Sequence, residues 1–274
     1  MTFSQHPDSY PKGAVITGAA RRIGRALAWD LAGAGYAVAV HYRSSGREAE
    51  ALVQEIRAAG GRAVALGADL ARESDAATLV SRAERALGPI GLLVNNASVF
   101  DYDDIATADR QSWDAHLEPN LRAPLVLTQG FVEALPPGDG GLVVNMIDAR
   151  VLNPTPRYLS YTVSKVALWS LTQSLAQALA PRVRVNAIGP GPVLPPDGQT
   201  EAEFEARCER LPLRRPAALA EICAALRFLL SAKSVTGQML ALDGGDHLAV
   251  KRSQQQPLSL ELNLLAGRHA VSDA

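Results

Sequence analysis

Short segments rich in β-branched residues alternate along this chain with longer segments that carry apolar residues every three or four positions. The short segments predict strands at residues 14–17, 36–41, 62–67, 92–95, 142–146, 183–188 and 239–242. The longer segments predict helices at residues 22–32, 47–59, 75–87, 113–133, 158–179 and 219–230. Strands and helices that alternate so regularly are joined by right-handed crossovers, which make neighbouring strands parallel. The sequence therefore predicts an α/β fold, a doubly wound parallel sheet of about seven strands with helices on both faces.

The length of 274 residues suits one such domain, and 47% hydrophobic residues with only 5% aromatics suit a sheet covered by amphipathic helices. We expect a single Rossmann-type domain over residues 12–248, with ligands at the carboxyl ends of its strands. Residues 189–216 are rich in proline and glycine, so they are expected to form a substrate lid instead of a packed element. Residues 249–274 are expected to form a tail or an intersubunit strand.

Charge and composition exclude several classes of protein. A net charge of −1 gives no electrostatic reason to expect nucleic acid or an anionic membrane as a partner. No apolar run is long enough for a membrane-spanning helix, and the polar residues 1–12 resemble neither a signal peptide nor an anchor. Cys208 and Cys223 are too few for a disulfide framework, which favours a reducing cytoplasm. The five histidines are scattered, so we expect no metal site.

The first predicted strand runs into a glycine-containing turn and then into a helix. Gly18 allows a tight turn, and Gly24 lets the helix pack closely. The backbone amides near Arg22 and Ile23, at the start of the helix, would then face a pyrophosphate. Taken alone, this pattern fits an ordinary turn between a strand and a helix equally well.

The end of the second predicted strand indicates which dinucleotide would bind. Chains that bind NAD carry an acidic residue there, whereas this chain has His41 and then Arg43 and Ser44. The planar guanidinium of Arg43 can pair with a 2′-phosphate, and Ser44 can donate a hydrogen bond to it. A solvated basic turn is the alternative, but position, charge and the missing acid together predict NADPH as the cofactor.

Residues after the third and fourth strands fall at the same edge of the predicted sheet. Asp69 and Leu70 follow the third strand, and Asn96 and Ala97 follow the fourth. We expect all four to contact the cofactor. Asp69 could instead be a helix cap and Asn96 a turn former.

Tyr161 and Lys165 are four residues apart on a predicted helix, so the phenol and the ammonium lie on one face. A nearby cation favours the phenolate and is expected to lower the pKa of Tyr161 toward the range where it can move protons. Such pairs are common on solvated helices. The position of this pair, after the fifth strand, makes it informative.

Together these motifs resemble the short-chain dehydrogenase/reductase family over roughly residues 12–248. The resemblance implies that Tyr161 and Lys165 are catalytic, that Lys165 also holds the nicotinamide ribose, and that Asn120 supports a proton relay. The pair Pro190-Gly191 is similar to the family's residues beside the nicotinamide. The family also implies a homotetramer assembled through the two long helices after the fourth and fifth strands.

Two departures from the common family pattern resemble the pteridine reductases and the related dihydromonapterin reductases. Arg22 replaces the middle glycine of the turn, and Asp148 stands where most relatives carry a catalytic serine. Phe100, two residues after Ser98, matches an aromatic wall that stacks a pterin against the nicotinamide. The alternative for Phe100 is ordinary packing in the core or the lid. The resemblance implies that these four residues and Tyr161 contact the substrate.

The resemblance implies NADPH-dependent reduction of a dihydropterin to a tetrahydropterin, or of an oxidised pterin to a dihydropterin. Tyr161 would protonate the ring in one step, and Asp148 would supply the proton in the step that forms the tetrahydropterin. One rival is a reductase of another carbonyl such as a 3-oxoacyl thioester, which an ionised Asp148 is poorly suited to polarise. A second rival is an NADPH-binding protein without turnover. Dihydrobiopterin, dihydromonapterin and dihydrofolate all fit the pterin hypothesis.

Overall fold

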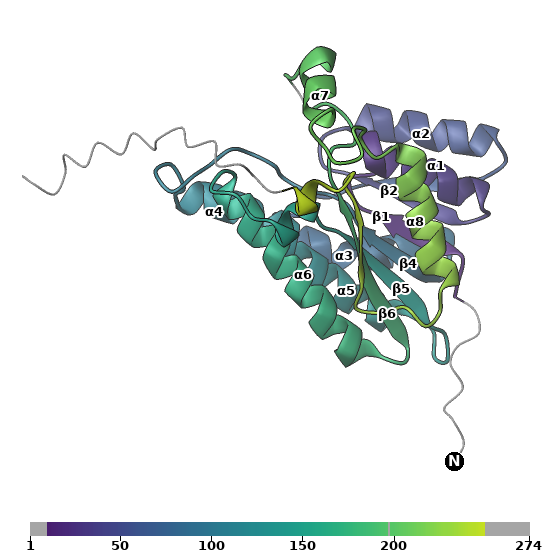
Figure 1. Ribbon diagram of the computed structural model, residues 1–274. Helices are drawn as coiled ribbons and strands as arrows, with labels where there is room; N and C mark the ends of the chain where they lie inside the picture. The colour runs from purple at the N-terminus through teal and green to yellow at the C-terminus, as the bar shows by residue number, and fades with distance from the viewer. Residues whose placement is uncertain (1–9, 197, 250–274) are drawn as a thin grey trace, which may run out of the picture.

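Seven parallel strands form one sheet in the computed structural model, which describes residues 10–196 and 198–249 (Figure 1). The order across the sheet is β3-β2-β1-β4-β5-β6-β7. The strands are β1 (Gly13–Ile16), β2 (Ala37–Tyr42), β3 (Arg62–Gly67), β4 (Ile90–Asn95), β5 (Gly141–Met146), β6 (Val183–Pro190) and β7 (Met239–Leu242). All adjacent pairs are parallel. The predicted doubly wound α/β fold is confirmed.

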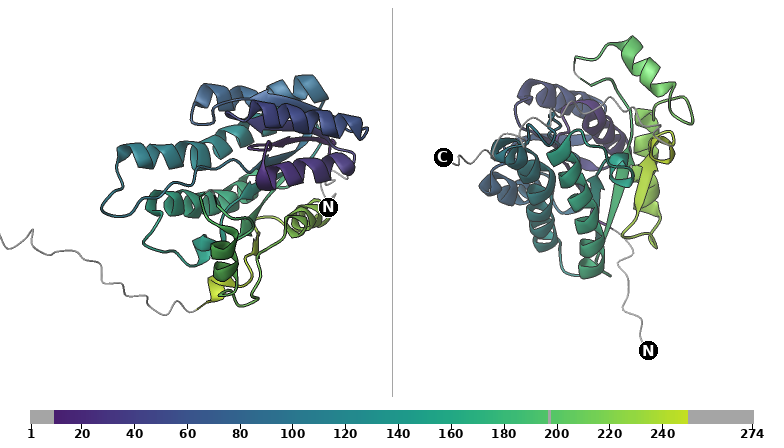
Figure 2. Two further views of the ribbon diagram at one scale, coloured as in Figure 1. Left: turned by 90° about the horizontal axis from the view of Figure 1, so that it is seen from above. Right: turned by 60° about the vertical axis from the view of Figure 1, so that its left-hand side comes forward.

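Helices cover both faces of the sheet (Figures 1 and 2). They are α1 (Arg22–Gly33), α2 (Gly46–Ala58), α3 (Glu73–Leu87), α4 (Arg110–Leu117), α5 (Ala123–Ala134), α6 (Leu159–Leu179), α7 (Glu201–Cys208) and α8 (Leu219–Ser231). Successive strand residues point to opposite faces, so Ile16 packs with α1, α2 and α8, while Val15 packs with α3, α5 and α6. Burial on both sides explains why the strands are almost continuously apolar.

The strand order reverses direction between β1 and β4, and this reversal positions the site. From β1 the chain proceeds outward through β2 and β3, and it then returns to place β4 on the other side of β1. The connections on the two sides leave a crevice at the carboxyl ends of these strands, where ligands of such sheets bind. The residues that sequence analysis singled out lie at this edge.

The predicted helix over residues 113–133 is interrupted in the structure. It begins earlier, at Arg110, where Asp109 and Ser112 form a capping box. A π-helical turn, Glu118–Arg122, then separates α4 from α5. Pro119 and Pro124 lack an N–H, so they cannot continue the regular ladder of hydrogen bonds. The interruption contains Asn120, one of the predicted catalytic residues.

The lid region, residues 189–216, contains a packed element that sequence analysis did not expect. Thr200 and Glu203 form a capping box at the start of α7, and Phe204 and Cys208 on this helix are buried against Leu211. Figure 1 shows α7 projecting beyond the carboxyl edge of the sheet. The predicted tail, residues 249–274, lies outside the described residues apart from its first residue. Among the described helices, none combines the length and apolarity that a membrane crossing requires.

Candidate active site

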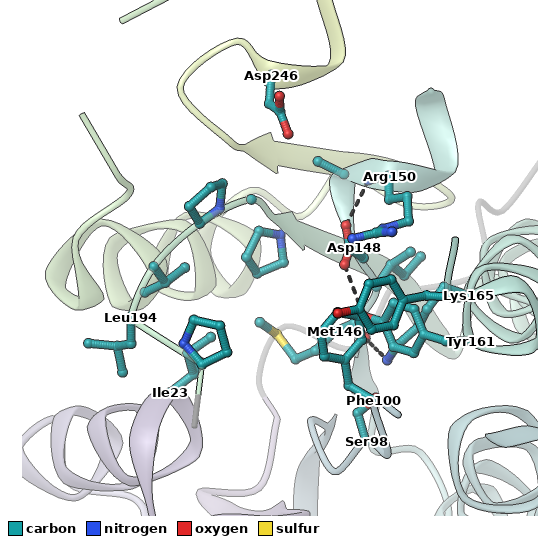
Figure 3. Close-up of a pocket in the computed structure, with 18 of the residues that line it drawn as sticks. Ile23, Ser98, Phe100, Met146, Asp148, Arg150, Tyr161, Lys165, Leu194 and Asp246 are labelled. Atoms are coloured by element: carbon teal, nitrogen blue, oxygen red, sulfur yellow. Dashed lines mark hydrogen bonds between the residues drawn. The ribbon is translucent and has the colours of Figure 1, made fainter. Parts of the chain in front are cut away.

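Two connected cavities occupy the carboxyl edge of the sheet. The larger, of about 830 Å³, lies between the ends of β5 and β6, the start of α6 and the lid (Figure 3). The smaller, of about 360 Å³, lies over the glycine-containing turn and the end of β2. The two cavities share Arg22, Ile23, Asn96 and Ser98 as lining residues. One elongated cleft therefore runs from β2 to the lid.

The turn after β1 is built to receive an anion. Gly18 has φ of +62°, a left-handed conformation that favours glycine. A Cβ on Gly24 would lie 2.3 Å from the carbonyl oxygen of Gly18, so only glycine allows α1 to approach the turn this closely. Arg21 makes no side-chain cap at the start of α1, which leaves the first amides of the helix free to bind a pyrophosphate.

His41 fixes the turn to the second strand from a buried position. The Gly18 amide donates to Nδ1 of His41 at 2.9 Å, so the ring proton lies on Nε2, which is 3.1 Å from the Ala68 carbonyl oxygen. Burial lowers the pKa of His41 from 6.5 to about 4. The imidazole is thus neutral at pH 7. It joins the turn after β1 to the loop after β3 by two hydrogen bonds.

The ends of β1 and β4 are joined by a compact set of hydrogen bonds. The hydroxyl oxygen of Thr17 accepts from the amides of Asn96 and Ala97, at 2.8 and 2.9 Å. The side-chain amide of Asn96 donates back to the carbonyl oxygens of Thr17 and Gly18. Asn96 and Ala97, which are predicted to bind the cofactor, therefore hold the glycine-containing turn in place.

The end of the cleft at β2 has the features expected for a 2′-phosphate. Arg43 and Ser44 are exposed and line the smaller cavity together with Asp69 and Leu70. Asp69 also serves as a turn cap, because its carboxylate accepts from the amide of Ala71 at 3.1 Å. The cavity, the exposed guanidinium and the free amides at α1 fit NADPH.

Asp148 and Tyr161 form a hydrogen-bonded pair in the larger cavity. The phenol of Tyr161 donates to Oδ2 of Asp148 at 3.0 Å, and the amide of Arg150 donates to Oδ1 at 2.7 Å. Figure 3 shows the carboxyl group between Tyr161 and Arg150, within the cavity. Asp148 ends the loop after β5, and the hydrogen bond from Arg150 caps the following 3₁₀ turn, Ala149–Leu152.

The electrostatics of Tyr161 differ from the sequence-based expectation. Burial raises the pKa of Tyr161 well above its ordinary value, and the neighbouring carboxylate of Asp148 raises it further. The expectation that Lys165 lowers this pKa is wrong for this geometry. The ammonium lies 5.7 Å from the centroid of the Tyr161 ring and donates to the carbonyl oxygen of Met146 at 2.9 Å. Burial lowers the pKa of Lys165 to about 8.

Asn120 is fully buried and joins the loop after β4 to helix α6. Its carbonyl oxygen accepts from the amide of Val99 at 2.8 Å and from the hydroxyl of Ser98 at 3.2 Å. Its side-chain amide donates to the carbonyl oxygen of Val99 and to the hydroxyl of Ser164. These contacts anchor the segment that leads to Phe100. A part for Asn120 in a proton relay stays a prediction.

Phe100 forms an exposed aromatic wall of the larger cavity. It is 42% exposed, which excludes packing in the core, and it lines the cavity, whereas the alternative of packing against the lid is not tested by its exposure. One face stacks on Tyr158, with ring centroids 4.4 Å apart, and Tyr161 meets the ring edge-on at 4.6 Å. The guanidinium of Arg150 lies over both Phe100 and Tyr158. Sequence analysis did not single out Tyr158 or Arg150. Tyr158 is close in sequence to Tyr161, and Arg150 is close to Asp148, so their positions could have indicated that they line the site.

Arg22 connects the glycine-containing turn to the lid. Its backbone has φ of +53°, at the position where the common family pattern has glycine. Its guanidinium donates to the carbonyl oxygens of Leu194 and Pro195 across the cleft. Arg22 lines both cavities, as its predicted contacts with cofactor and substrate require. Pro190 and Gly191, predicted to lie beside the nicotinamide, line the larger cavity.

Within residues 10–196 and 198–249, no cluster of three or more histidine, cysteine or acidic side chains is arranged to hold a metal ion.

Comparisons with known proteins agree with this geometry. Residues 12–206 match the family model described as short chain dehydrogenase. A solved structure of FolM alternative dihydrofolate reductase 1 from Brucella canis, complexed with NADP, is 48% identical with a TM-score of 0.84. That alignment covers 86% of this chain and 94% of the other.

Two curated relatives extend the comparison. A short-chain type dehydrogenase/reductase from Picea abies is 33% identical, covering 85% of this chain and 91% of the relative. The 3-oxoacyl-acyl-carrier-protein reductase FabG of Staphylococcus epidermidis is 30% identical, covering 86% and 99% respectively.

Arg43 provides a test of cofactor preference. The variant Arg43→Ala removes a charge-assisted contact worth about 1.5–3 kcal/mol, so the Kd for NADPH should rise roughly 10- to 100-fold. The Kd for NADH should change little, because NADH lacks the 2′-phosphate. Both constants can be measured by nucleotide fluorescence. Arg85→Ala removes the same charge from an exposed position on α3, outside the cavity lining, and serves as the control. An unchanged NADPH-to-NADH ratio in Arg43→Ala would contradict the phosphate site.

His41 predicts a specific loss of stability in acid. Its folded-state pKa of about 4 is below the unfolded value of 6.5, so the unfolded chain binds the proton first as the pH falls. Stability is complete above pH 6.5 and decreases toward pH 4; at pH 5 this residue should cost on the order of 2 kcal/mol. Urea unfolding at pH 7 and pH 5 measures the difference. His41→Gln should lose less stability over this interval than the wild-type chain, and equal losses would contradict the assignment.

Proposed function

The chain belongs to the short-chain dehydrogenase family and is an NADPH-dependent oxidoreductase, and we propose that it reduces a pterin. The reaction takes a dihydropterin to a tetrahydropterin, and the same site suits reduction of an oxidised pterin to a dihydropterin. The observation that carries the proposal is the Asp148 carboxyl group, which lies within the cavity and accepts the Tyr161 phenol beside an aromatic wall.

The wall determines what shape of substrate fits. Phe100 stacks on Tyr158, both rings line the cavity, and Phe100 is 42% exposed. Stacking on such a surface favours a flat aromatic ring and would add little for an aliphatic ketone. The solved FolM relative, an alternative dihydrofolate reductase, supports a pterin-type ring as the substrate.

The protein's own residues supply the proton chemistry. When bound, NADPH supplies a hydride to a ring carbon, and the adjacent ring nitrogen must then gain a proton. Because its pKa is raised, Tyr161 remains protonated and acts as a donor. Asp148 accepts the hydrogen bond of the Tyr161 phenol. In the step that forms the tetrahydropterin, its carboxylate takes up a proton from solvent and passes it through a water to the ring nitrogen. Lys165, held by the Met146 carbonyl oxygen, is placed to orient the nicotinamide ribose.

A second candidate function is reduction of a 3-oxoacyl thioester, favoured by the 30% identity to FabG. Such a reaction needs a donor that polarises the ketone oxygen. A carboxylate offers only acceptors, and Asp148 already engages the hydroxyl of Tyr161. The geometry therefore supports the pterin better.

We also expect a homotetramer that acts in the cytoplasm. The exposed side of α5 and α6 carries Leu125 and Leu171 around a hollow of about 560 Å³, and Val166 on α6 is 40% exposed. Burying this surface against a second copy would follow the assembly implied by the family. Cys208 and Cys223 are both free, which suits a reducing compartment.

NADPH oxidation by the purified protein tests the proposed substrate. The panel is dihydrobiopterin, dihydromonapterin, dihydrofolate, quinonoid dihydropteridine and an acetoacetyl thioester. We expect turnover with at least one of the dihydropterins or dihydrofolate. Turnover of the thioester alone would reject the pterin proposal in favour of the second candidate, and tight NADPH binding without any turnover would favour a non-catalytic protein.

Asp148→Ser tests the carboxyl group directly. Loss of a positioned proton donor should lower kcat/KM for the dihydropterin by roughly 100-fold or more, with little change in the Kd for NADPH. Steady-state kinetics and fluorescence titration measure the two effects. Asp246→Ser removes another carboxyl group from the cavity lining and is the matched control (Figure 3). Equal activity of Asp148→Ser and the wild type would remove Asp148 from the mechanism.

A further inference from the structure

A buried polar cluster lies behind the aromatic wall, and neither the cofactor nor the proposed proton transfers use it. The cluster consists of Asp103, His116 and Ser160, which are 1%, 1% and 0% exposed. They come from three elements: the loop after β4, helix α4 and the start of α6. Buried polar groups cost free energy unless they are hydrogen-bonded, so the arrangement of this cluster is informative.

The donor and acceptor of each hydrogen bond in the cluster can be assigned consistently. The amide of Asp101 donates to Nε2 of His116 at 3.0 Å, so Nδ1 carries the ring proton. Nδ1 lies 2.9 Å from the carbonyl oxygen of Ser112 and 2.7 Å from the hydroxyl oxygen of Ser160. The hydroxyl of Ser160 in turn donates to Oδ2 of Asp103 at 2.5 Å.

Asp103 completes the cluster as an acceptor. Its Oδ1 accepts from the amide of Ser160 at 3.1 Å, and Oδ2 also accepts from the hydroxyl of Ser112 at 3.2 Å. The amide of Leu159 donates to its backbone carbonyl oxygen at 3.2 Å. The loop is thereby fixed to the first turn of α6, immediately before the proton donor Tyr161.

Four residues of this segment line the cavity: Ser98, Phe100, Asp101 and Tyr102. The segment is also held at three of its positions. The amide of Val99 donates to Asn120, the amide of Asp101 donates to His116, and Asp103 accepts from the amides of Leu159 and Ser160 at the start of α6. Phe100 lies between the first two of these anchors, so a displacement at either one would move it.

We infer that Asp103, His116 and Ser160 are positioning residues that fix Phe100 relative to Tyr161 and thereby set the width of the substrate slot. The cluster acts on the position of Phe100, and His116 also meets the ring of Tyr161 edge-on, with ring centroids 6.1 Å apart; a phenylalanine at 116 keeps a ring there, so His116→Phe chiefly tests the route through Phe100. The inference rests on the proposed function only in that Phe100 stacks on a pterin. It adds a specificity-determining element that lies outside the cavity.

The variant His116→Phe tests the inference, because it keeps a ring in the space but removes the acceptor for the Asp101 amide and the Nδ1 donor. Amide hydrogen exchange at Asp101 should accelerate roughly 10- to 100-fold, the effect of losing one partly buried hydrogen bond, and Val99 should follow. His116→Gln can restore an acceptor near the position of Nε2, so it should recover part of the protection. Unchanged exchange at both amides in His116→Phe would overturn the inference.

Kinetics with dihydrobiopterin, or with whichever dihydropterin or dihydrofolate the wild type turns over, separate positioning from general stability. In His116→Phe, kcat/KM should fall on the order of 10- to 100-fold, with the Kd for NADPH unchanged. In a Phe100→Ala background the same substitution should have almost no further effect, because the residue acts through Phe100. Full additivity of the two substitutions would overturn the inference.

Two further variants complete the design. Ser160→Ala is milder and should reproduce the same pattern if His116→Phe does not fold. Asn186→Leu is the matched control: Asn186 is equally buried and anchors the backbone at Val235 and Gln238, away from the cavity. It should lower the Tm without changing exchange at Asp101 or the KM. A wild-type protein inactive on every pterin would reject the proposed function alone, because the exchange measurement needs no substrate.

Discussion

The reversal of strand order between β1 and β4 is the constraint on which the whole site depends. Parallel strands on either side of this point have their carboxyl ends at one edge of the sheet. The backbone N–H and C=O groups beyond the strand ends need hydrogen-bond partners other than a neighbouring strand. Thr17 and Asn96 provide these partners by hydrogen-bonding to each other across the ends of β1 and β4. The same contacts hold the free amides of α1 toward the cleft, so the fold and the phosphate site share one set of hydrogen bonds.

The hydrogen-bonded pair of Tyr161 and Asp148 determines which group in the site can donate a proton. A carboxylate within hydrogen-bonding distance opposes ionisation of Tyr161, and burial opposes it as well. A tyrosine in this environment retains its proton and gives it up only to a group that becomes basic during the reaction. In the proposed pterin reduction, hydride addition to the ring creates such a group at the adjacent nitrogen. The pairing of Tyr161 with Asp148 therefore suits the proposed reaction.

Sequence analysis predicted the sheet and the cofactor, and it placed the candidate site residues at the carboxyl edge of the sheet, because each leaves a local signal. Strand alternation, the turn around Gly18 and the spacing of Tyr161 and Lys165 can be recognised within a few residues. The lid helix α7 was missed although Thr200 and Glu203 form a readable capping box, because neighbouring prolines dominated the interpretation. The pKa of Tyr161 was misjudged because burial and the Asp148 contact depend on tertiary structure. His116 and Ser160 are 44 positions apart, so no local pattern joins them.

The two sides of the substrate cavity are held by hydrogen bonds of different kinds, and this difference has a functional consequence. Behind Phe100 the contacts of Asp103 with Ser160 are fully buried, where water cannot replace them. The lid is joined to the turn by exposed hydrogen bonds from Arg22, which exchange with water at little cost. Opening of the predicted lid would therefore leave the aromatic wall in place. One rigid side and one movable side would suit the proposed substrate, a flat ring whose attached side chain can vary.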